Sequence, residues 1–227
     1  RRIPLDEMVD GDSSLSTTLI RGLDILACFM GGEQTLTNAQ IAASVGINKA
    51  TVSRLCKTLI ALHYLRRAPQ GGFQLAPGLL ALSYPILSNM KWRRQAVGLM
   101  QEYAEIAKGN VSLAVFNGAD AVYVQTVGDI GDFPHVPEMG MTVPVADSST
   151  GRSLLSLLSE AERIEKYREV ESVYPGAVQR SKERIERSIE SCHSRGFCTS
   201  YGEWRETIYA MSAPVGRTSD GLEVTLS

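Results

Sequence analysis

Three short helices are predicted from the hydrophobic pattern in the first third of the chain. Apolar residues recur at helical spacing over Leu19–Ala27, and a glycine pair four residues later is a typical helix stop. Thr37 and Gln40 form a capping-box pattern that opens a second helix, which ends at Gly46. A third helix is predicted over about Asn48–His63, because asparagine is a favoured cap residue. The short glycine turn between the last two helices is typical of a helix-turn-helix.

A short β-hairpin and a linker helix are predicted next. Tyr64–Arg67 and Gly72–Leu75 are β-prone, and the turn residues Ala68–Gly71 lie between them. Helical periodicity returns over Ala76–Met90, which we interpret as a linker. Pro85 is expected to break or kink this helix, because proline lacks the N–H that the helix needs.

The second half of the chain changes character after a long amphipathic helix predicted over about Lys91–Lys108. The elements that follow are strands at Val111–Phe116 and Ala121–Val127, a short strand near Met141–Val145 within the loop Gly128–Pro144, helices at Ser148–Leu158, Glu160–Glu171 and Ser181–Arg195, and strands at Phe197–Tyr201, Thr207–Val215 and Leu222–Ser227. This order predicts an α+β domain with an antiparallel sheet. Because the chain stops inside the last predicted strand, we expect a further C-terminal element.

These elements predict four parts: a flexible arm over residues 1–15, a winged helix-turn-helix over 16–76, a linker helix over 77–90 and an α/β domain over 91–227. The first residue is not Met, so we expect the natural start upstream. No apolar stretch has the length of a membrane span, and the first residues lack the apolar core of a secretory signal. We therefore expect a cytoplasmic protein with no membrane partner.

Charge is distributed unevenly along the chain. With 44% hydrophobic and 21% charged residues, the chain has the composition of a globular protein. Its net charge of −2 argues, by itself, against a nucleic-acid partner. Residues 16–75, however, hold six cations and two carboxylates and carry a net charge of +4, which leaves −6 for the remainder. A basic segment joined to an acidic body is typical of a two-part DNA-binding regulator.

The third predicted helix has an apolar face and a basic face. At 100° per residue, Val52, Leu55, Leu59 and Leu62 cluster on one side, where they can pack on the preceding helices. The opposite side combines small residues, which permit close approach to a major groove, with cations for phosphates and for guanine. The candidate DNA-contacting residues are Lys49, Ala50, Thr51, Ser53, Arg54 and Lys57 in this helix, with Arg66 and Arg67 in the hairpin as a wing. A protein-interaction module with a solvated basic face would show the same spacing.

Other chemistries find little support in the sequence. Cys192 and His193 are neighbours on a predicted helix, so their side chains point about 100° apart and do not form a nucleophile–base pair. His63 lies in the basic segment and His135 in a loop. The four cysteines, Cys28, Cys56, Cys192 and Cys198, have no recognised zinc spacing and are interpreted as reduced thiols. We expect no enzyme activity, no cofactor and no metal; a ligand-sensing module or adaptor without DNA binding is the alternative.

Several segments resemble the IclR family of bacterial transcriptional regulators, in the order that the family has them. They are Ile20–Leu26, Leu36–Ala42, Gly46–Leu55, Phe73–Gly78, Pro144–Arg152, Arg195–Phe197 and Ala213–Val215. The resemblance implies a winged helix, a linker helix and a GAF-like effector-binding domain. It also implies homodimers or homotetramers on palindromic operators in double-stranded DNA, controlling catabolic operons in response to small organic acids.

A ligand site is predicted at the start of the helix near Ser148. Its backbone N–H groups and hydroxyls favour a carboxylate, although Asp147 and the hydroxyls could instead simply cap the helix. The resemblance implies an effector pocket beneath this helix start, lined by Ser149, Thr150, Gly151, Tyr201, Met211, Thr225 and Ser227. Relatives that bind very small polar acids place a carboxylate or thiol where Tyr201 and Met211 lie. The larger side chains here imply a larger, aromatic ligand.

Overall fold

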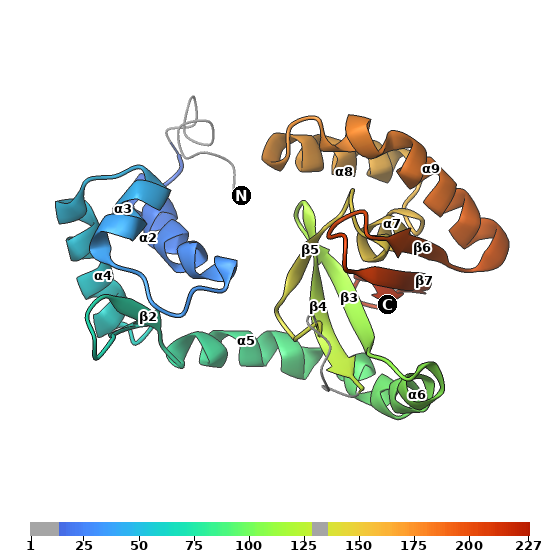
Figure 1. Ribbon diagram of the computed structural model, residues 1–227, viewed down its shortest axis with the longest axis horizontal. Coiled ribbons are helices and arrows are strands. Elements are labelled where there is room, and N and C mark those ends of the chain that lie inside the picture. The colour runs from blue at the N-terminus through green and yellow to red at the C-terminus, as the bar shows by residue number, and fades with distance from the viewer. Residues whose placement is uncertain (1–13, 129–135) are drawn as a thin grey trace. The chain divides into compact units, whose positions relative to one another are not determined.

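The computed structural model describes residues 14–128 and 136–227, which form two compact units (Figure 1). The first unit ends at Asn89, and the second runs from Met90 to Ser227. Most of the arm predicted over residues 1–15 lies outside the described residues, as do His135 and part of the loop Gly128–Pro144.

The first unit has the helices and the hairpin that the sequence predicts. Thr37 and Gln40 form the capping box, with Thr37 Oγ1 accepting from Gln40 N at 3.3 Å. Asn48 Oδ1 caps the third helix by accepting from Thr51 N at 2.8 Å. The elements are α2 (Thr17–Ala27), η1 (Cys28–Gly31), α3 (Asn38–Val45), α4 (Lys49–Ala61), β1 (Leu65–Arg67), β2 (Phe73–Leu75) and α5 (Gly78–Asn89).

The core of the first unit confirms most of the predicted apolar face of α4. Val52, Leu55 and Leu59 are buried against α2, α3 and the hairpin. The prediction for Leu62 is wrong: its side chain is 52% exposed, because α4 ends at Ala61 and Leu62 is only its C-cap residue. Cys56, which lies 40° from Val52 around the helix, completes the buried face instead.

Helix α5 continues through Pro85, so the predicted break does not occur. The proline leaves the carbonyl of Ala81 without its helical donor. Both residues are exposed, so water can supply the missing hydrogen bond. Gly78 begins the helix where a Cβ would lie 2.3 Å from the carbonyl oxygen of His63, so only glycine permits this close approach.

The second unit is the predicted α+β domain. Its strands form one antiparallel six-stranded sheet in the order β5-β4-β3-β8-β7-β6. The elements are α6 (Lys91–Ala107), β3 (Val111–Asn117), β4 (Asp120–Val127), β5 (Thr142–Pro144), α7 (Ser149–Leu155), α8 (Glu160–Val173), α9 (Ala177–Arg195), β6 (Cys198–Tyr201), β7 (Tyr209–Arg217) and β8 (Glu223–Leu226).

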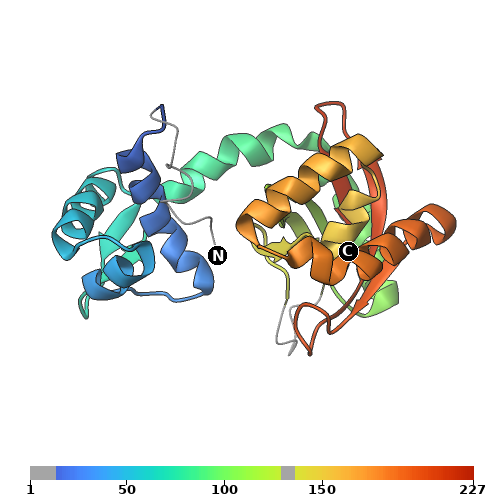
Figure 2. The same cartoon turned by 90° about the horizontal axis from the view of Figure 1, so that it is seen from above.

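Helices cover both faces of the sheet within this unit. On β3, Leu113 and Val115 pack with Met100 of α6, whereas Ala114 faces the opposite side and packs with Leu154 of α7. Helices α8 and α9 lie beyond α7 on that same side (Figures 1 and 2). The short helix α7 is therefore held between the sheet and α9.

Close packing of α7 requires a glycine at position 151. A Cβ there would lie 2.3 Å from Val145 Cα and 2.4 Å from Val145 O, so the backbone would have to move. The backbone N–H of Gly151 already donates to its own helix cap, Ser148 Oγ, at 3.0 Å. Ser148 therefore caps α7, as the capping interpretation expects. Gly151 is needed for the close packing of α7 on Val145.

Gly151→Ala should destabilise the protein by about 3 kcal/mol, because the new methyl group would collide with the backbone of Val145. Gly98→Ala is a matched control on α6, where a Cβ would meet no atom within 4 Å. The control should be neutral or more stable by about 0.5–1 kcal/mol, since alanine favours helix. Thermal and urea unfolding followed by circular dichroism would measure both. Equal stability of the two variants would contradict the packing argument.

Candidate DNA interface and ligand cavity

Helix α4 presents the face that the sequence predicts for DNA contact. Lys49, Ala50, Ser53, Arg54 and Lys57 are all exposed, and Thr51 is half-buried. Ala50, Arg54 and Lys57 lie on the side opposite the buried residues, whereas Lys49 and Ser53 lie at the flank next to Cys56. The face thus combines two small residues with three long cations. Such a surface can enter a major groove, neutralise phosphates and present an arginine to base edges.

The hairpin carries both predicted wing cations in exposed positions. Arg66 lies opposite Gln74 in the two-stranded sheet. The guanidinium carbon of Arg67 lies 4.8 Å from the centroid of the Phe73 ring. This cation–π contact holds the stem of Arg67 along the hairpin and leaves its charge at the surface.

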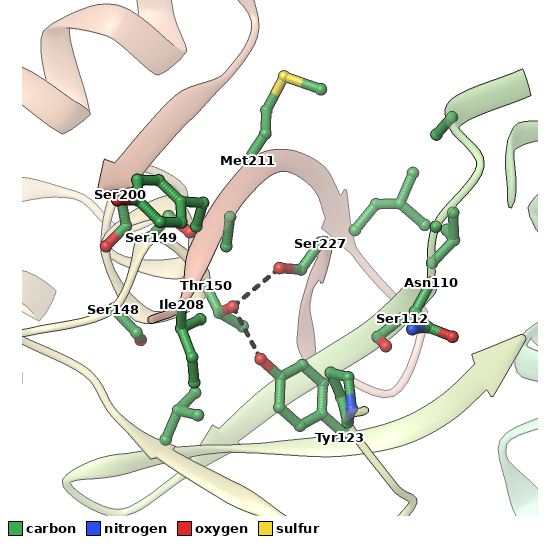
Figure 3. Close-up of a pocket in the computed structure, with 18 of the residues that line it drawn as sticks. Asn110, Ser112, Tyr123, Ser148, Ser149, Thr150, Ser200, Ile208, Met211 and Ser227 are labelled. Carbon is green, nitrogen blue, oxygen red and sulfur yellow. Dashed lines mark hydrogen bonds between the residues drawn. The ribbon is translucent and has the colours of Figure 1, made fainter. Parts of the chain in front are cut away.

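A cavity of about 700 Å³ lies within the second unit, between the sheet, the start of α7 and the segment before β7 (Figure 3). Apolar and aromatic side chains form much of its wall, among them Met141, Val143, Trp204, Ile208 and Leu226. Among its described lining residues none carries a charged side chain. A volume of this size and a largely apolar wall suit a small organic ligand.

Five hydroxyl groups form a hydrogen-bonded chain, and all of them except Ser212 line the cavity. Thr150 Oγ1 lies 3.2 Å from the Tyr123 hydroxyl and 3.0 Å from Ser227 Oγ, and Figure 3 shows Thr150 between them. Ser212 Oγ continues the chain, 3.0 Å from Ser227 Oγ and 2.9 Å from Ser149 Oγ. Burial raises the pKa of the Tyr123 phenol above its ordinary value, so this group keeps its proton at neutral pH.

The structure brings four of the seven predicted effector residues to the cavity: Ser149, Thr150, Met211 and Ser227. Tyr201 is not among the lining residues; Ser200 takes that place, because neighbouring residues of β6 point to opposite faces. The side chain of Tyr201 is 68% exposed and packs edge-on against Tyr209.

Gly151 and Thr225 also lie outside the cavity lining. Gly151 is used in the close packing of α7 on Val145. Thr225 Oγ1 donates to Ser153 Oγ at 2.7 Å, so its hydroxyl joins β8 to the back of α7. Sequence reasoning missed Tyr123 and Ser212, whose only signal was their place within predicted strands.

A buried arginine anchors α7 from behind. The side chain of Arg152 is 1% exposed, and its guanidinium donates to Ser188 Oγ at 2.8 Å, to the carbonyl oxygen of Thr199 at 3.1 Å and to Glu203 Oε2 at 2.5 Å. Desolvation raises the pKa of Glu203, but hydrogen bonds from Ser200 and Arg152 outweigh it and leave that pKa below its usual range. This ion pair ties α7 to the segment that carries the lining residues Trp204 and Ile208.

The cysteines are free thiols in the described residues; Cys28 is half-buried and the other three are buried. A hydrogen bond from Cys198 is the main reason that the pKa of Cys192 falls below its usual value. Within residues 14–128 and 136–227, no group of three or more His, Cys, Asp or Glu side chains is placed to hold a metal. No helix in this described part is long and apolar enough to cross a membrane.

A winged helix-turn-helix and an α/β domain with an internal cavity define a transcriptional regulator with an effector-binding domain. The model of the IclR helix-turn-helix domain matches residues 18–69, and that of the bacterial transcriptional regulator IclR C-terminal domain matches residues 85–227. The chain therefore belongs to the IclR family of bacterial transcriptional regulators, which is not an enzyme family.

Similar proteins support this assignment over nearly the whole chain. The crystal structure of an IclR family transcriptional regulator from Brucella abortus is 35% identical, covers 99% of this chain and 86% of its own, and superposes with a TM-score of 0.80. The regulator KipR of Bacillus subtilis is 24% identical over 87% of this chain and 79% of its own. An IclR homologue from Microbacterium hydrocarbonoxydans, solved with 4-hydroxybenzoate, shares the fold at 19% identity, with 92% and 87% coverage and a TM-score of 0.72.

Glu203→Gln should lower the stability of the protein by about 2 kcal/mol at pH 7, because Arg152 would stay buried without its anion. The folded pKa of Glu203 is lowered, so its contribution is present above the unfolded pKa of about 4.3 and is lost as pH falls through the folded value. The stability difference between Glu203→Gln and wild type should therefore narrow towards pH 3. Glu165→Gln, in an exposed pair with Arg168, is the control and should change stability little. Thermal unfolding at pH 7 and at pH 3 measures the stability of each protein. A stability difference between Glu203→Gln and wild type that grows in acid would contradict the ion-pair argument.

Proposed function

We propose that this protein controls a catabolic operon in the bacterial cytoplasm, as a homodimer or homotetramer on a palindromic operator, in response to a small aromatic acid. The observation that carries the proposal is the pairing, in one chain, of the basic exposed face of α4 with the hydroxyl-lined cavity. Two-fold symmetric operators follow from two-fold symmetric dimers, each subunit placing one recognition helix in the major groove.

Arg54 and Lys57 are proposed to have different tasks at the DNA. An arginine guanidinium can form two hydrogen bonds with O6 and N7 of guanine, which gives base preference. A lysine ammonium is a point charge that suits phosphates and contributes to affinity on any sequence. Lys49, Ala50, Thr51, Ser53, Arg66 and Arg67 are proposed to complete the contact surface.

The cavity supports an aromatic acid as the ligand. Trp204, Met141 and Ile208 offer an apolar wall to a ring, and the hydroxyls of Tyr123, Thr150 and Ser227 offer hydrogen bonds to a polar group. Because no charged side chain lies among the described lining residues, the carboxylate would be held by hydroxyl donors rather than by an ion pair. The complex of the Microbacterium homologue makes 4-hydroxybenzoate a natural first probe.

Ligand control is proposed to work as a population shift. The ligand favours one arrangement of the subunits, and α5 transmits this preference to the spacing of the two recognition helices. Couplings of this kind are typically about 1–3 kcal/mol, equivalent to a change of roughly five- to 150-fold in operator affinity.

Arg54→Ala and Lys57→Ala should weaken DNA binding in distinguishable ways. Loss of Lys57 should lower affinity uniformly and reduce the slope of log affinity against log salt by about 1, whereas loss of Arg54 should also relax base preference by about 1–3 kcal/mol. Arg168→Ala, exposed on α8, is the control and should bind as wild type does. Binding to duplexes selected from a random library, measured at several salt concentrations, provides the test. Unchanged binding by both α4 variants would exclude α4 as the recognition helix.

Thr150→Val should weaken binding of 4-hydroxybenzoate about three- to tenfold, because it removes the central hydroxyl of the chain. Thr58→Val, exposed on α4, is a matched control. Isothermal titration calorimetry with 4-hydroxybenzoate, benzoate and glyoxylate would measure these affinities. Tight binding of glyoxylate with no binding of either aromatic acid would overturn the proposed ligand class, and a ligand that leaves operator affinity unchanged would overturn the proposed control.

A further inference from the structure

Asn38 connects the first helix of the helix-turn-helix motif to the proposed DNA-reading face. It is the first residue of α3, and its side-chain amide reaches α4. Asn38 Nδ2 lies 2.8 Å from Ser53 Oγ and 3.3 Å from the carbonyl oxygen of Lys49. One amide nitrogen thus contacts both a backbone group and an exposed hydroxyl of the proposed recognition helix.

The chemistry of these neighbours fixes the direction of both hydrogen bonds. A backbone carbonyl only accepts, so the amide group that faces Lys49 O must be the NH2 group. The same nitrogen has no lone pair to offer, so Ser53 Oγ must be the acceptor of the shorter bond. The other end of the amide, Asn38 Oδ1, is buried with no hydrogen-bond partner in the described residues. The polar contribution of Asn38 therefore comes from its NH2 group.

The proton of Ser53 is left free to point away from the protein. Serine in a helix commonly donates its hydroxyl proton to the carbonyl four residues earlier, which here belongs to Lys49. That carbonyl already accepts the backbone N–H of Ser53 within α4 and the amide of Asn38. With both acceptor sites of Lys49 O in use, the hydroxyl of Ser53 keeps an outward donor, while one of its two acceptor sites is taken by Asn38.

We infer that Asn38 polarises Ser53 into a hydrogen-bond donor at the DNA face, so that Ser53 selects a base whose own major-groove edge presents an acceptor. The inference rests on the proposed function, in which α4 enters that groove. A serine by itself can pair with either a donor or an acceptor. Guanine presents N7 and O6 and thymine presents O4, which pair with the outward proton of Ser53. Cytosine presents an amino donor, which can use only the second acceptor site of Ser53 and leaves that proton without a partner, so the contacted position discriminates against cytosine. Asn38 is a positioning residue that acts through Ser53.

The test is a selection from a random-sequence duplex library with the full chain, comparing wild type, Asn38→Asp, Asn38→Ala, Ser53→Ala and the double variant Asn38→Asp/Ser53→Ala. At one position in each half-site, wild type should disfavour cytosine about three- to tenfold, and Ser53→Ala should abolish this discrimination. A carboxylate at position 38 accepts only, so it takes the Ser53 proton, and Asn38→Asp should reverse the preference towards cytosine. The double variant should match Ser53→Ala at that position.

Asn38→Ala provides a second test that does not depend on the folding of the aspartate variant. Thermal unfolding of each protein identifies a folding defect. Without the amide, Ser53 pairs with donor and acceptor alike, so discrimination should fall towards that of Ser53→Ala. A cytosine discrimination that persists in Asn38→Ala would overturn the inference. A loss of DNA affinity in Asn38→Ala that is the same for all sequences would also overturn the inference, because it indicates a structural role or a phosphate contact for Asn38. Wild-type protein that enriches no sequence would instead overturn the proposed DNA-binding function, and the inference with it.

Discussion

The ligand cavity depends on the burial of one guanidinium. Arg152 stands on the side of α7 that faces away from the cavity, and its hydrogen bonds to Ser188, Thr199 and Glu203 reach α9, β6 and the segment before β7. A buried charge is tolerated only when its donors are satisfied, so the elements that supply the acceptors are held in fixed positions. Because α7 also supplies Ser149 and Thr150 to the cavity, the position of these hydroxyls follows from the acceptors around Arg152.

A second layer of polar side chains also shapes the proposed DNA face. Asn38 does for Ser53 what Arg152 does for the start of α7: a supporting residue fixes the position or the hydrogen-bonding character of a residue that is proposed to contact DNA or ligand. In both cases the supporting residue lies on a different element from the residue it supports. Precise sites are commonly built this way, because a packed neighbour restricts both the rotamer and the polarity of the contacting group.

Local signals in the sequence predicted most elements, whereas the lining of the cavity depended on contacts that the sequence does not display. The capping box at Thr37 and the cap at Asn48 are decided within a single turn, so they were predictable. Leu62 was misplaced because helical periodicity does not mark where α4 ends. Tyr201 was misplaced because a shift of one residue reverses the face of a strand, and only pairing with β7 fixes which of Ser200 and Tyr201 faces the cavity. Ser212 and Tyr123 come from strands far apart in the sequence and are connected through Thr150 of α7 and Ser227.

The hydroxyl chain from Tyr123 through Thr150, Ser227 and Ser212 to Ser149 has a consequence for the polarity of the cavity. Five hydroxyls bring five protons, and the four contacts between them use four. The remaining proton belongs to the one hydroxyl that accepts without donating within the chain, and rotation of the hydroxyls moves this role from one member to another without moving an oxygen atom. A ligand atom that accepts would draw this proton towards itself, and one that donates would turn it away. The wall of the cavity is therefore polarisable, and its electrostatic character is set by the molecule that enters.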